Sequence, residues 1–199
     1  MSYRSTQTAR RTLHEIASMQ GGYFTAKQAI KAGYTKQHVD YHVKAENFER
    51  VQRGLYRLPE IPVGEHDELI RLTLWSCGRD DAPQAVISHE TALGIHGLGE
   101  LLPKKVHLTV PKSFRKKPPR NVILHRASLV AADLEEREGF RTTSPARTLI
   151  DVAAATTVSQ EQLEKALHEA LQRGLVRRAQ MLKLGPEHER LARALKKHG

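Results

Sequence analysis

A glycine and a threonine two residues apart, Gly33 and Thr35, constrain the fold of this 199-residue chain more than any other feature. Gly33 follows a short helical pattern and suits the left-handed conformation that ends a helix, because glycine has no Cβ. Thr35 is suited to cap the next helix, which we expect to run to about Ala45. The pair therefore predicts two helices joined by a tight turn.

The segments on either side of this turn complete a recognisable order of elements. Upstream, the pattern predicts a helix over residues 6–19, then a short extended piece, and then the second helix with Thr25 as its cap. Downstream, residues 48–58 alternate like the two strands of a hairpin that turns at Arg53 and Gly54. The order helix, strand, helix, turn, helix, hairpin predicts a winged helix-turn-helix over residues 1–62.

The third predicted helix has one apolar side. Val39 and Val43 are four residues apart and therefore share a face. When this face is set inward at 100° per residue, Gln37, Tyr41 and Lys44 point outward. A helix enters the major groove of DNA only if one face packs on its own domain and the other offers hydrogen-bonding groups. The pattern therefore predicts that this helix reads bases.

Positive charge supports the same interpretation. Residues 1–62 hold ten Lys and Arg against five Asp and Glu, and the whole chain carries a formal net charge of +10. Such a surplus favours polyanionic partners, nucleic acid first. Arg53 adds a charge at the hairpin tip, where the adjacent Gly54 lets the backbone approach a phosphate or a minor groove closely. The predicted DNA-binding residues are Lys36, Gln37, His38, Tyr41, Lys44, Arg50, Arg53 and Arg57.

A second, different domain is expected after residue 62, because two prolines and a glycine interrupt all periodicity there. Residues 63–180 show both strand-like and helical patterns and are predicted to form an α+β antitoxin or effector domain. Residues 181–199 are predicted to form a charged C-terminal helix or tail with frayed ends. The predicted fold class is therefore α+β, an N-terminal winged helix-turn-helix followed by a C-terminal mixed α+β domain.

The second domain contains a concentrated basic segment, since no acidic residue occurs between residues 101 and 132. Such a segment could grip DNA beside the winged domain, or an RNA, or an acidic toxin surface. It could equally be a solvated connection between strands. The residues of this second basic patch are Lys104, Lys105, Lys112, Arg115, Lys116, Lys117 and Arg120.

The same segment argues against an enzyme. A restriction-type nuclease needs two or more carboxylates and a lysine on its strands, and the predicted strands VHLTV and VILHR carry no carboxylate. His89, His96, His107 and His125 invite comparison with a metal site, but His89 and Glu90 are not followed by a second histidine at zincin spacing. Neither a phosphate loop nor a nucleophile elbow occurs. We therefore expect no catalytic residue, no metal and no cofactor.

The expected location is the cytoplasm. Cys77 is the only cysteine, so no disulfide can form within the chain, which fits a reducing compartment. The N-terminus lacks the apolar core of a signal peptide, and no apolar run is long enough to cross a bilayer. We expect no association with membranes.

At this level of detail the sequence resembles a known family. Residues 21–59 read GGYFTAKQAIKAGYTKQHVDYHVKAENFERVQRGLYRLP. They resemble the N-terminal winged domain of AbiEi-type antitoxins, which are the repressor halves of type IV toxin–antitoxin systems. The last part, ERVQRGLYRLP, is similar to the strand–turn–strand wing of that family. Four later pieces are also similar: AVISHETALGIHGL, VHLTVPKSFRKKP, VILHR and TTSPARTLIDVA. Together they extend the resemblance over roughly residues 10–155.

The resemblance implies a cytoplasmic autoregulator that binds repeats in its own promoter and opposes a nucleotidyltransferase-type toxin. The recognition helix departs from the more basic versions expected in the family, since Gln37, His38, Asp40 and His42 occupy positions often held by Arg or Lys. This departure leaves the operator sequence open. The sequence therefore predicts a sequence-specific repressor that binds double-stranded DNA. Two alternatives remain at this stage: a protein-interaction antitoxin with a vestigial winged domain, and a nucleic-acid-processing enzyme that uses the second domain.

Overall fold

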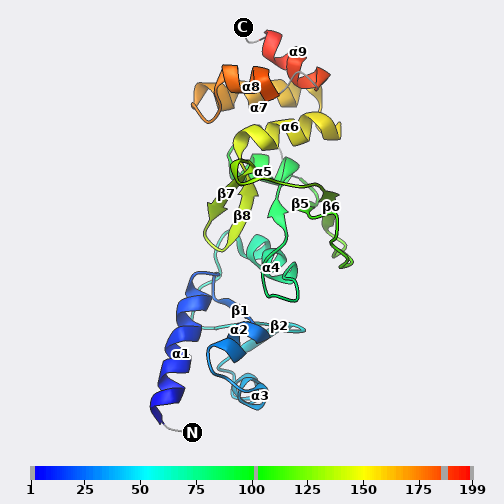
Figure 1. The fold of residues 1–199 in the computed structure, drawn as a ribbon. Helices are drawn as coiled ribbons and strands as arrows, with labels where there is room; N and C mark the ends of the chain where they lie inside the picture. The colour runs from blue at the N-terminus through cyan, green and yellow to red at the C-terminus, as the bar shows by residue number, and fades with distance from the viewer. Residues whose placement is uncertain (1–2, 101–102, 185–187, 198–199) are drawn as a thin grey trace. The chain divides into compact units, whose positions relative to one another are not determined.

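The computed structural model of the chain is a mixed α+β fold made of two compact units (Figure 1). It describes residues 3–100, 103–184 and 188–197. The first unit holds the chain up to Gln84 together with Arg137–Phe140, and the second holds Ala85–Glu136 and the chain from Arg141 onward. The predicted fold class is confirmed.

The N-terminal unit opens with the predicted winged helix-turn-helix. Its elements are α1 (Tyr3–Ser18), β1 (Tyr23–Thr25), α2 (Ala26–Lys31), α3 (Lys36–Lys44), β2 (Glu49–Gln52) and β3 (Leu55–Arg57). Strand β3 lies in the centre of a three-stranded sheet, antiparallel to both β1 and β2. The Thr25 and Thr35 hydroxyls cap α2 and α3 by accepting backbone N–H groups, as predicted. Gly33, in the turn between these helices, has a φ of 110°, which favours glycine.

An apolar core fixes the orientation of α3. Leu13 of α1, Phe24 of β1 and Val39 of α3 are buried in one cluster, and Val43 packs at its edge. The Phe24 ring meets the Phe48 ring edge to face, with 5.0 Å between their centroids. The prediction that Val39 and Val43 anchor α3 inward is thereby confirmed.

The N-terminal unit reaches past the boundary predicted after residue 62, because α4 (Asp67–Trp75) and the loop after it belong to it. The Tyr23 hydroxyl donates to the Asp67 carboxylate over 2.6 Å. The Thr25 hydroxyl donates to the Asp81 carboxylate over 3.0 Å. Both contacts fix α4 and its loop to β1 and to the cap of α2.

The C-terminal unit contains a five-stranded sheet with the strand order β6-β5-β4-β8-β7. Its elements are β4 (Val86–Ile87), α5 (His89–Ile95), β5 (Val106–Val110), β6 (Val122–Arg126), the 3₁₀ turn η1 (Ala131–Asp133), β7 (Leu134–Arg137), β8 (Phe140–Thr143), α6 (Pro145–Ala155), α7 (Gln160–Gln172), α8 (Arg178–Leu184) and α9 (Glu189–Lys197). Strand β4 pairs antiparallel with β5 and parallel with β8, and β5 pairs parallel with β6.

Helices α5 to α9 share one apolar core, and α9 belongs to it. The described residues include the expected charged helix, α9, but this helix packs on the core instead of fraying. Leu191, Ala194 and Leu195 are buried, and their spacing places them on one side of the helix. Among the described helices, none combines the length with the apolar composition that a membrane span requires.

Candidate nucleic-acid interface

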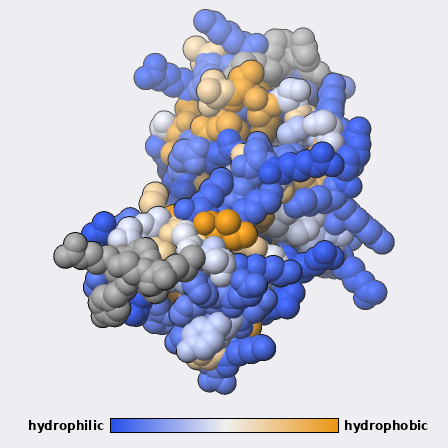
Figure 2. All heavy atoms as spheres, turned by 60° about the horizontal axis from the view of Figure 1, so that its bottom comes forward, coloured by the Kyte–Doolittle hydropathy of each residue, from blue (hydrophilic) through white to orange (hydrophobic). Residues whose placement is uncertain are grey.

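Helix α3 presents the side that the sequence predicts. Lys36, Gln37, His38 and Lys44 are exposed, and Tyr41 is 64% exposed, whereas Val39 is 3% exposed. On the face of the molecule that Figure 2 shows, hydrophilic residues predominate and apolar residues form smaller patches. Helix α3 therefore offers amide, hydroxyl and ammonium groups on a side that the N-terminal unit does not cover.

The wing is an open, basic hairpin. Arg50 on β2 and Arg53 at the turn are both exposed. Gly54 next to Arg53 has a φ of 78°, and a Cβ added there would meet no atom within 4 Å. The register of β2 and β3 shifts between Arg50 and Gln52, an irregularity that increases local twist. The tip can therefore approach a flat or grooved surface without obstruction from its own unit.

Arg57 does not join this surface, in contrast to the prediction. Its side chain is 9% exposed, and its guanidinium lies 3.6 Å from the Glu49 carboxylate. The guanidinium also donates to the Ile61 carbonyl. Because β3 is the central strand, all of its residues are buried. Leu55 precedes Arg57 by two residues and so shares its face of the strand, which is the sequence signal that indicated burial.

The second basic patch lies in the C-terminal unit around β5 and β6, and all of its residues are exposed. Because β5 and β6 are parallel, their connection must return along the length of the strands. The pairing of Val106 with Val122 brings Lys104, Lys105 and Arg120 to the same end of the strand pair. Phe114 is 3% exposed, so one side chain of the connection is anchored in the unit.

Three of the four histidines considered for a metal site come together in the C-terminal unit. The rings of His89 and His125 stack with 3.4 Å between centroids, and a hydrogen bond of 3.1 Å joins His107 Nδ1 to His125 Nε2. His96 lies apart from them and bonds the Thr143 carbonyl through Nε2 over 2.7 Å. Among the described residues, no group of three His, Cys, Asp or Glu side chains is arranged to hold a metal ion.

Burial keeps these three imidazoles neutral. It lowers the pKa of His89 to about 3 and that of His125 to about 4, and the neighbouring imidazoles lower both further. Burial also lowers the pKa of His107, which faces Glu90 at 3.8 Å. His89 has a φ of 54°, a conformation that few residues other than glycine adopt. Its Nδ1 is hydrogen-bonded to the buried Ser88 hydroxyl over 2.9 Å.

Arg147 and Asp151, one turn apart on α6, form an ion pair with 2.7 Å between Nε and Oδ1. Asp133 also contacts the Arg147 guanidinium at 3.2 Å. Burial raises the pKa of Asp151 even though Arg147 acts against this shift. A guanidinium held by two carboxylates serves to fix α6 to the chain near η1, and it has little capacity left for a ligand.

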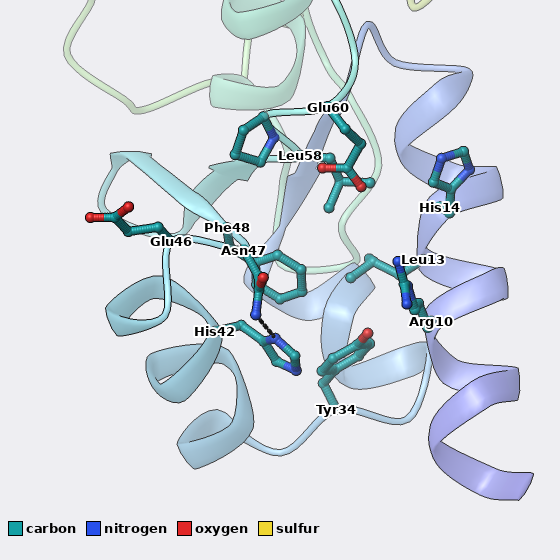
Figure 3. Close-up of a pocket in the computed structure, with 11 residues that line it drawn as sticks. Arg10, Leu13, His14, Tyr34, His42, Glu46, Asn47, Phe48, Leu58 and Glu60 are labelled. Atoms are coloured by element: carbon teal, nitrogen blue, oxygen red, sulfur yellow. Dashed lines mark hydrogen bonds between the residues drawn. The ribbon is translucent and has the colours of Figure 1, made fainter. Parts of the chain in front are cut away.

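A cavity in the N-terminal unit was not apparent from the sequence. It has a volume of about 450 Å³ and lies between α1, the C-terminal end of α3 and the residues that follow β3 (Figure 3). Its walls come from segments that are distant in sequence, so no local pattern could reveal it. Its lining residues are Arg10, Leu13, His14, Tyr34, His42, Glu46, Asn47, Phe48, Leu58, Pro59 and Glu60.

Comparison with known proteins gives two family matches. Residues 11–59 match a family described as a transcriptional regulator, AbiEi antitoxin, and residues 84–193 match the AbiEi antitoxin C-terminal domain. The crystal structure of the RV2827C protein from Mycobacterium tuberculosis is similar at 18% sequence identity and a TM-score of 0.47, covering 96% of this chain and 81% of that one. A search of curated proteins gave no match. The predicted resemblance to AbiEi-type antitoxins is confirmed.

Proposed function

Because this chain belongs to the AbiEi antitoxin family, we propose that it is a sequence-specific DNA-binding repressor and the autoregulating antitoxin of a type IV toxin–antitoxin pair. Its DNA ligand is double-stranded and consists of repeats in its own promoter, so the protein acts in the cytoplasm. The exposed side of α3, opposite the buried Val39, is the observation that carries this proposal.

Each polar group of α3 and the wing has a role in the proposal. Gln37 pairs with an adenine edge, because its amide offers a donor and an acceptor at the spacing of the adenine N6 and N7 atoms. Tyr41 contacts a phosphate or a thymine methyl group, and Lys44 contacts guanine or phosphate. Lys36 and His38 lie at the flank of the helix and contact the phosphate backbone of the DNA. Arg50 and Arg53 bring the wing to a phosphate or a minor groove.

We assign the two parts of the chain different tasks. The winged helix-turn-helix of residues 1–62 binds DNA, and the C-terminal unit forms the antitoxin or effector domain, to which the charged helix α9 belongs. The partner of the effector domain is a nucleotidyltransferase-type toxin. Neither matching family is described as an enzyme, which supports a regulatory role for this domain. The second basic patch supplies additional contacts to nucleic acid from the effector domain.

Fluorescence anisotropy with a labelled promoter fragment and a scrambled duplex of equal length tests the proposal. The protein is expected to prefer the promoter. Gln37→Ala should reduce that preference by about 1–3 kcal/mol and leave scrambled-duplex binding nearly unchanged. Arg53→Ala should weaken binding to both duplexes and flatten the slope of log affinity against log salt by about one unit.

Lys183→Ala is the matched control, because it removes one exposed positive charge from α8, outside both proposed surfaces. Its salt slope should equal that of the unmodified protein. Equal affinity for the promoter and the scrambled duplex, at every salt concentration, would refute sequence-specific repression. A salt slope that Arg53→Ala and Lys183→Ala change equally would refute the role of the wing.

A further inference from the structure

The cavity of the N-terminal unit has the make-up of a ligand site that DNA recognition leaves unused. Its volume of about 450 Å³ is within the usual range for sites that hold small organic molecules. Its floor consists of buried apolar and aromatic side chains, among them Leu13, Tyr34, Phe48 and Leu58. Its rim is polar and exposed. A concave apolar floor with a few convergent polar groups is the common design of such sites.

One wall of the cavity is aromatic. The Tyr34 and His42 rings meet with 5.5 Å between centroids, and the His42 and Phe48 rings stack with 4.8 Å between centroids. The Asn47 amide donates to His42 Nδ1 over 3.2 Å, which leaves the proton of the neutral ring on Nε2 (Figure 3). Burial lowers the pKa of His42, so this ring is neutral in most molecules at neutral pH. A neutral aromatic wall favours a flat ring against it.

The opposite wall carries the positive charge of Arg10. Arg10 and His14 lie four residues apart on α1 and share the side that faces the cavity. Within the described part of the chain, no hydrogen bond or ion pair holds the Arg10 guanidinium. Burial raises the pKa of Tyr34 and the Arg10 charge opposes this shift, whereas burial lowers the pKa of His42 and the Arg10 charge adds to that shift. Arg10 therefore places a positive field inside the cavity, where an anionic group would be stabilised.

The acidic residues of the lining restrict the ligand further. Figure 3 shows Glu46 directed away from the other lining side chains, whereas Glu60 lies at the end of the cavity opposite Tyr34 and His42. The Glu60 carboxylate accepts hydrogen bonds and would repel a second negative charge. A ligand with one anionic group and one N–H donor can bind both the Arg10 guanidinium and the Glu60 carboxylate.

We propose that this cavity binds a small planar aromatic acid. Its carboxylate pairs with Arg10, assisted by His14, its ring packs against Tyr34 and His42, and a ring N–H donates to Glu60. Tyr34 comes directly before the cap of α3, and His42 lies in the last turn of that helix. A bound ligand therefore contacts the residue before the cap of α3 and the last turn of that helix. The effect of the ligand on DNA affinity rests on the proposed function, whereas binding of the ligand does not.

Isothermal titration calorimetry of the full chain tests the site with indole-3-acetate as the probe, which has one carboxylate and one ring N–H. Indole-3-acetamide has the same shape without the charge, and cyclohexylacetate has the charge without the aromatic ring. We expect saturable binding of indole-3-acetate and at least about tenfold weaker binding of each analogue. Arg10→Gln should weaken indole-3-acetate binding by at least about tenfold.

Arg11→Gln is the matched control, because Arg11 is the next residue of α1, is exposed, and does not line this cavity. It should leave binding unchanged, and an unaltered circular-dichroism melting curve of each variant shows that it is folded. Equal binding of the acid and its amide, or equal losses in Arg10→Gln and Arg11→Gln, would overturn the site. Absence of saturable binding at millimolar indole-3-acetate would also overturn it.

A separate measurement, DNA affinity in the presence of indole-3-acetate, tests whether the ligand regulates DNA binding. The carboxylate of the bound ligand adds negative charge near α3, so it should weaken binding to both the promoter and a scrambled duplex, with a larger effect at low salt. Unchanged DNA affinity in the presence of saturating indole-3-acetate would refute regulation and leave the site intact. Failure of the proposed function looks different, since the protein would then bind indole-3-acetate and show no preference for its promoter.

Discussion

The buried histidines of the C-terminal unit make its stability dependent on pH. His89 has a pKa of about 3 in the folded chain, compared with its ordinary value of 6.5 in an unfolded chain. Because the folded pKa is depressed, the unfolded chain binds protons at His89 before the folded chain does. The contribution of this group to stability is therefore complete above pH 6.5 and is lost as the pH falls toward 3. His107 and His125 act in the same direction.

The size of the effect follows from the shift. A pH of 5 is about 1.5 units below the pKa of His89 in the unfolded chain, so the residue is mostly protonated there. In the folded chain it is still neutral at this pH. Each unit corresponds to about 1.4 kcal/mol, so acidification from neutral pH to pH 5 costs about 2 kcal/mol at this residue. A typical domain is stable by only about 5–15 kcal/mol. The C-terminal unit should therefore weaken markedly at mildly acidic pH.

The substitution His89→Asn tests this reasoning. Asparagine tolerates the left-handed backbone at this position and keeps a polar group near the Ser88 hydroxyl. Urea denaturation followed by circular dichroism should show that the variant loses about 2 kcal/mol less than the unmodified protein between pH 7 and pH 5. The fluorescence of Trp75, on α4 in the N-terminal unit, reports separately on that unit. His14→Gln, at an exposed position of α1, should behave like the unmodified protein. Identical acid-induced losses in His89→Asn and the unmodified protein would refute the reasoning.

Three further substitutions test the packing of the chain. Arg57→Ala should destabilise the N-terminal unit by about 1–3 kcal/mol in urea denaturation, because it leaves Glu49 and the Ile61 carbonyl without their partner. Arg53→Ala, the control, should change stability by less than about 0.5 kcal/mol. Equal losses in the two variants would contradict the burial of Arg57. Thr25→Val removes the cap of α2 and the hydrogen bond to Asp81, and should lower the stability of the N-terminal unit by about 1–2 kcal/mol in the same assay. An unchanged urea midpoint would mean that neither the cap nor the contact with the loop after α4 stabilises the winged fold. Leu195→Ala should destabilise the C-terminal unit by about 2–5 kcal/mol, and a loss below 1 kcal/mol, as expected for a frayed tail, would contradict the packing of α9.

Local signals in the sequence were sufficient for the winged fold. Gly33 and Thr35 define the turn by their own backbone preferences, and the four-residue spacing of Val39 and Val43 sets the orientation of α3. These features depend on neighbours within a few residues, which is why they can be read without tertiary contacts. The exposed positions of α3 follow from the same spacing.

Features that depend on tertiary contacts were missed. Strand β7 reads LEER, and three charged residues in four carry no strand signal. It forms because it extends the sheet beside β8, an edge position where polar side chains can face solvent. The charged helix α9 was predicted, but its packing was not, because charges dominate its composition; Leu191, Ala194 and Leu195 suffice to hold it on the core.

The motif SHETALGIHGL shows why the functional character of the C-terminal unit was harder to read. Ser88 has the residue type and position of a helix cap, but its hydroxyl makes no capping bond in α5. Thr109 donates to that hydroxyl from β5 over 2.8 Å, and His89 Nδ1 lies 2.9 Å from it. The capping role was therefore displaced by partners that include one 21 residues away. His89 adopts a left-handed backbone at the start of α5 and stacks on His125 from β6. A buried polar network of this kind is specified by strand pairing, so a sequence pattern identifies its residues but not the contacts that decide what they do.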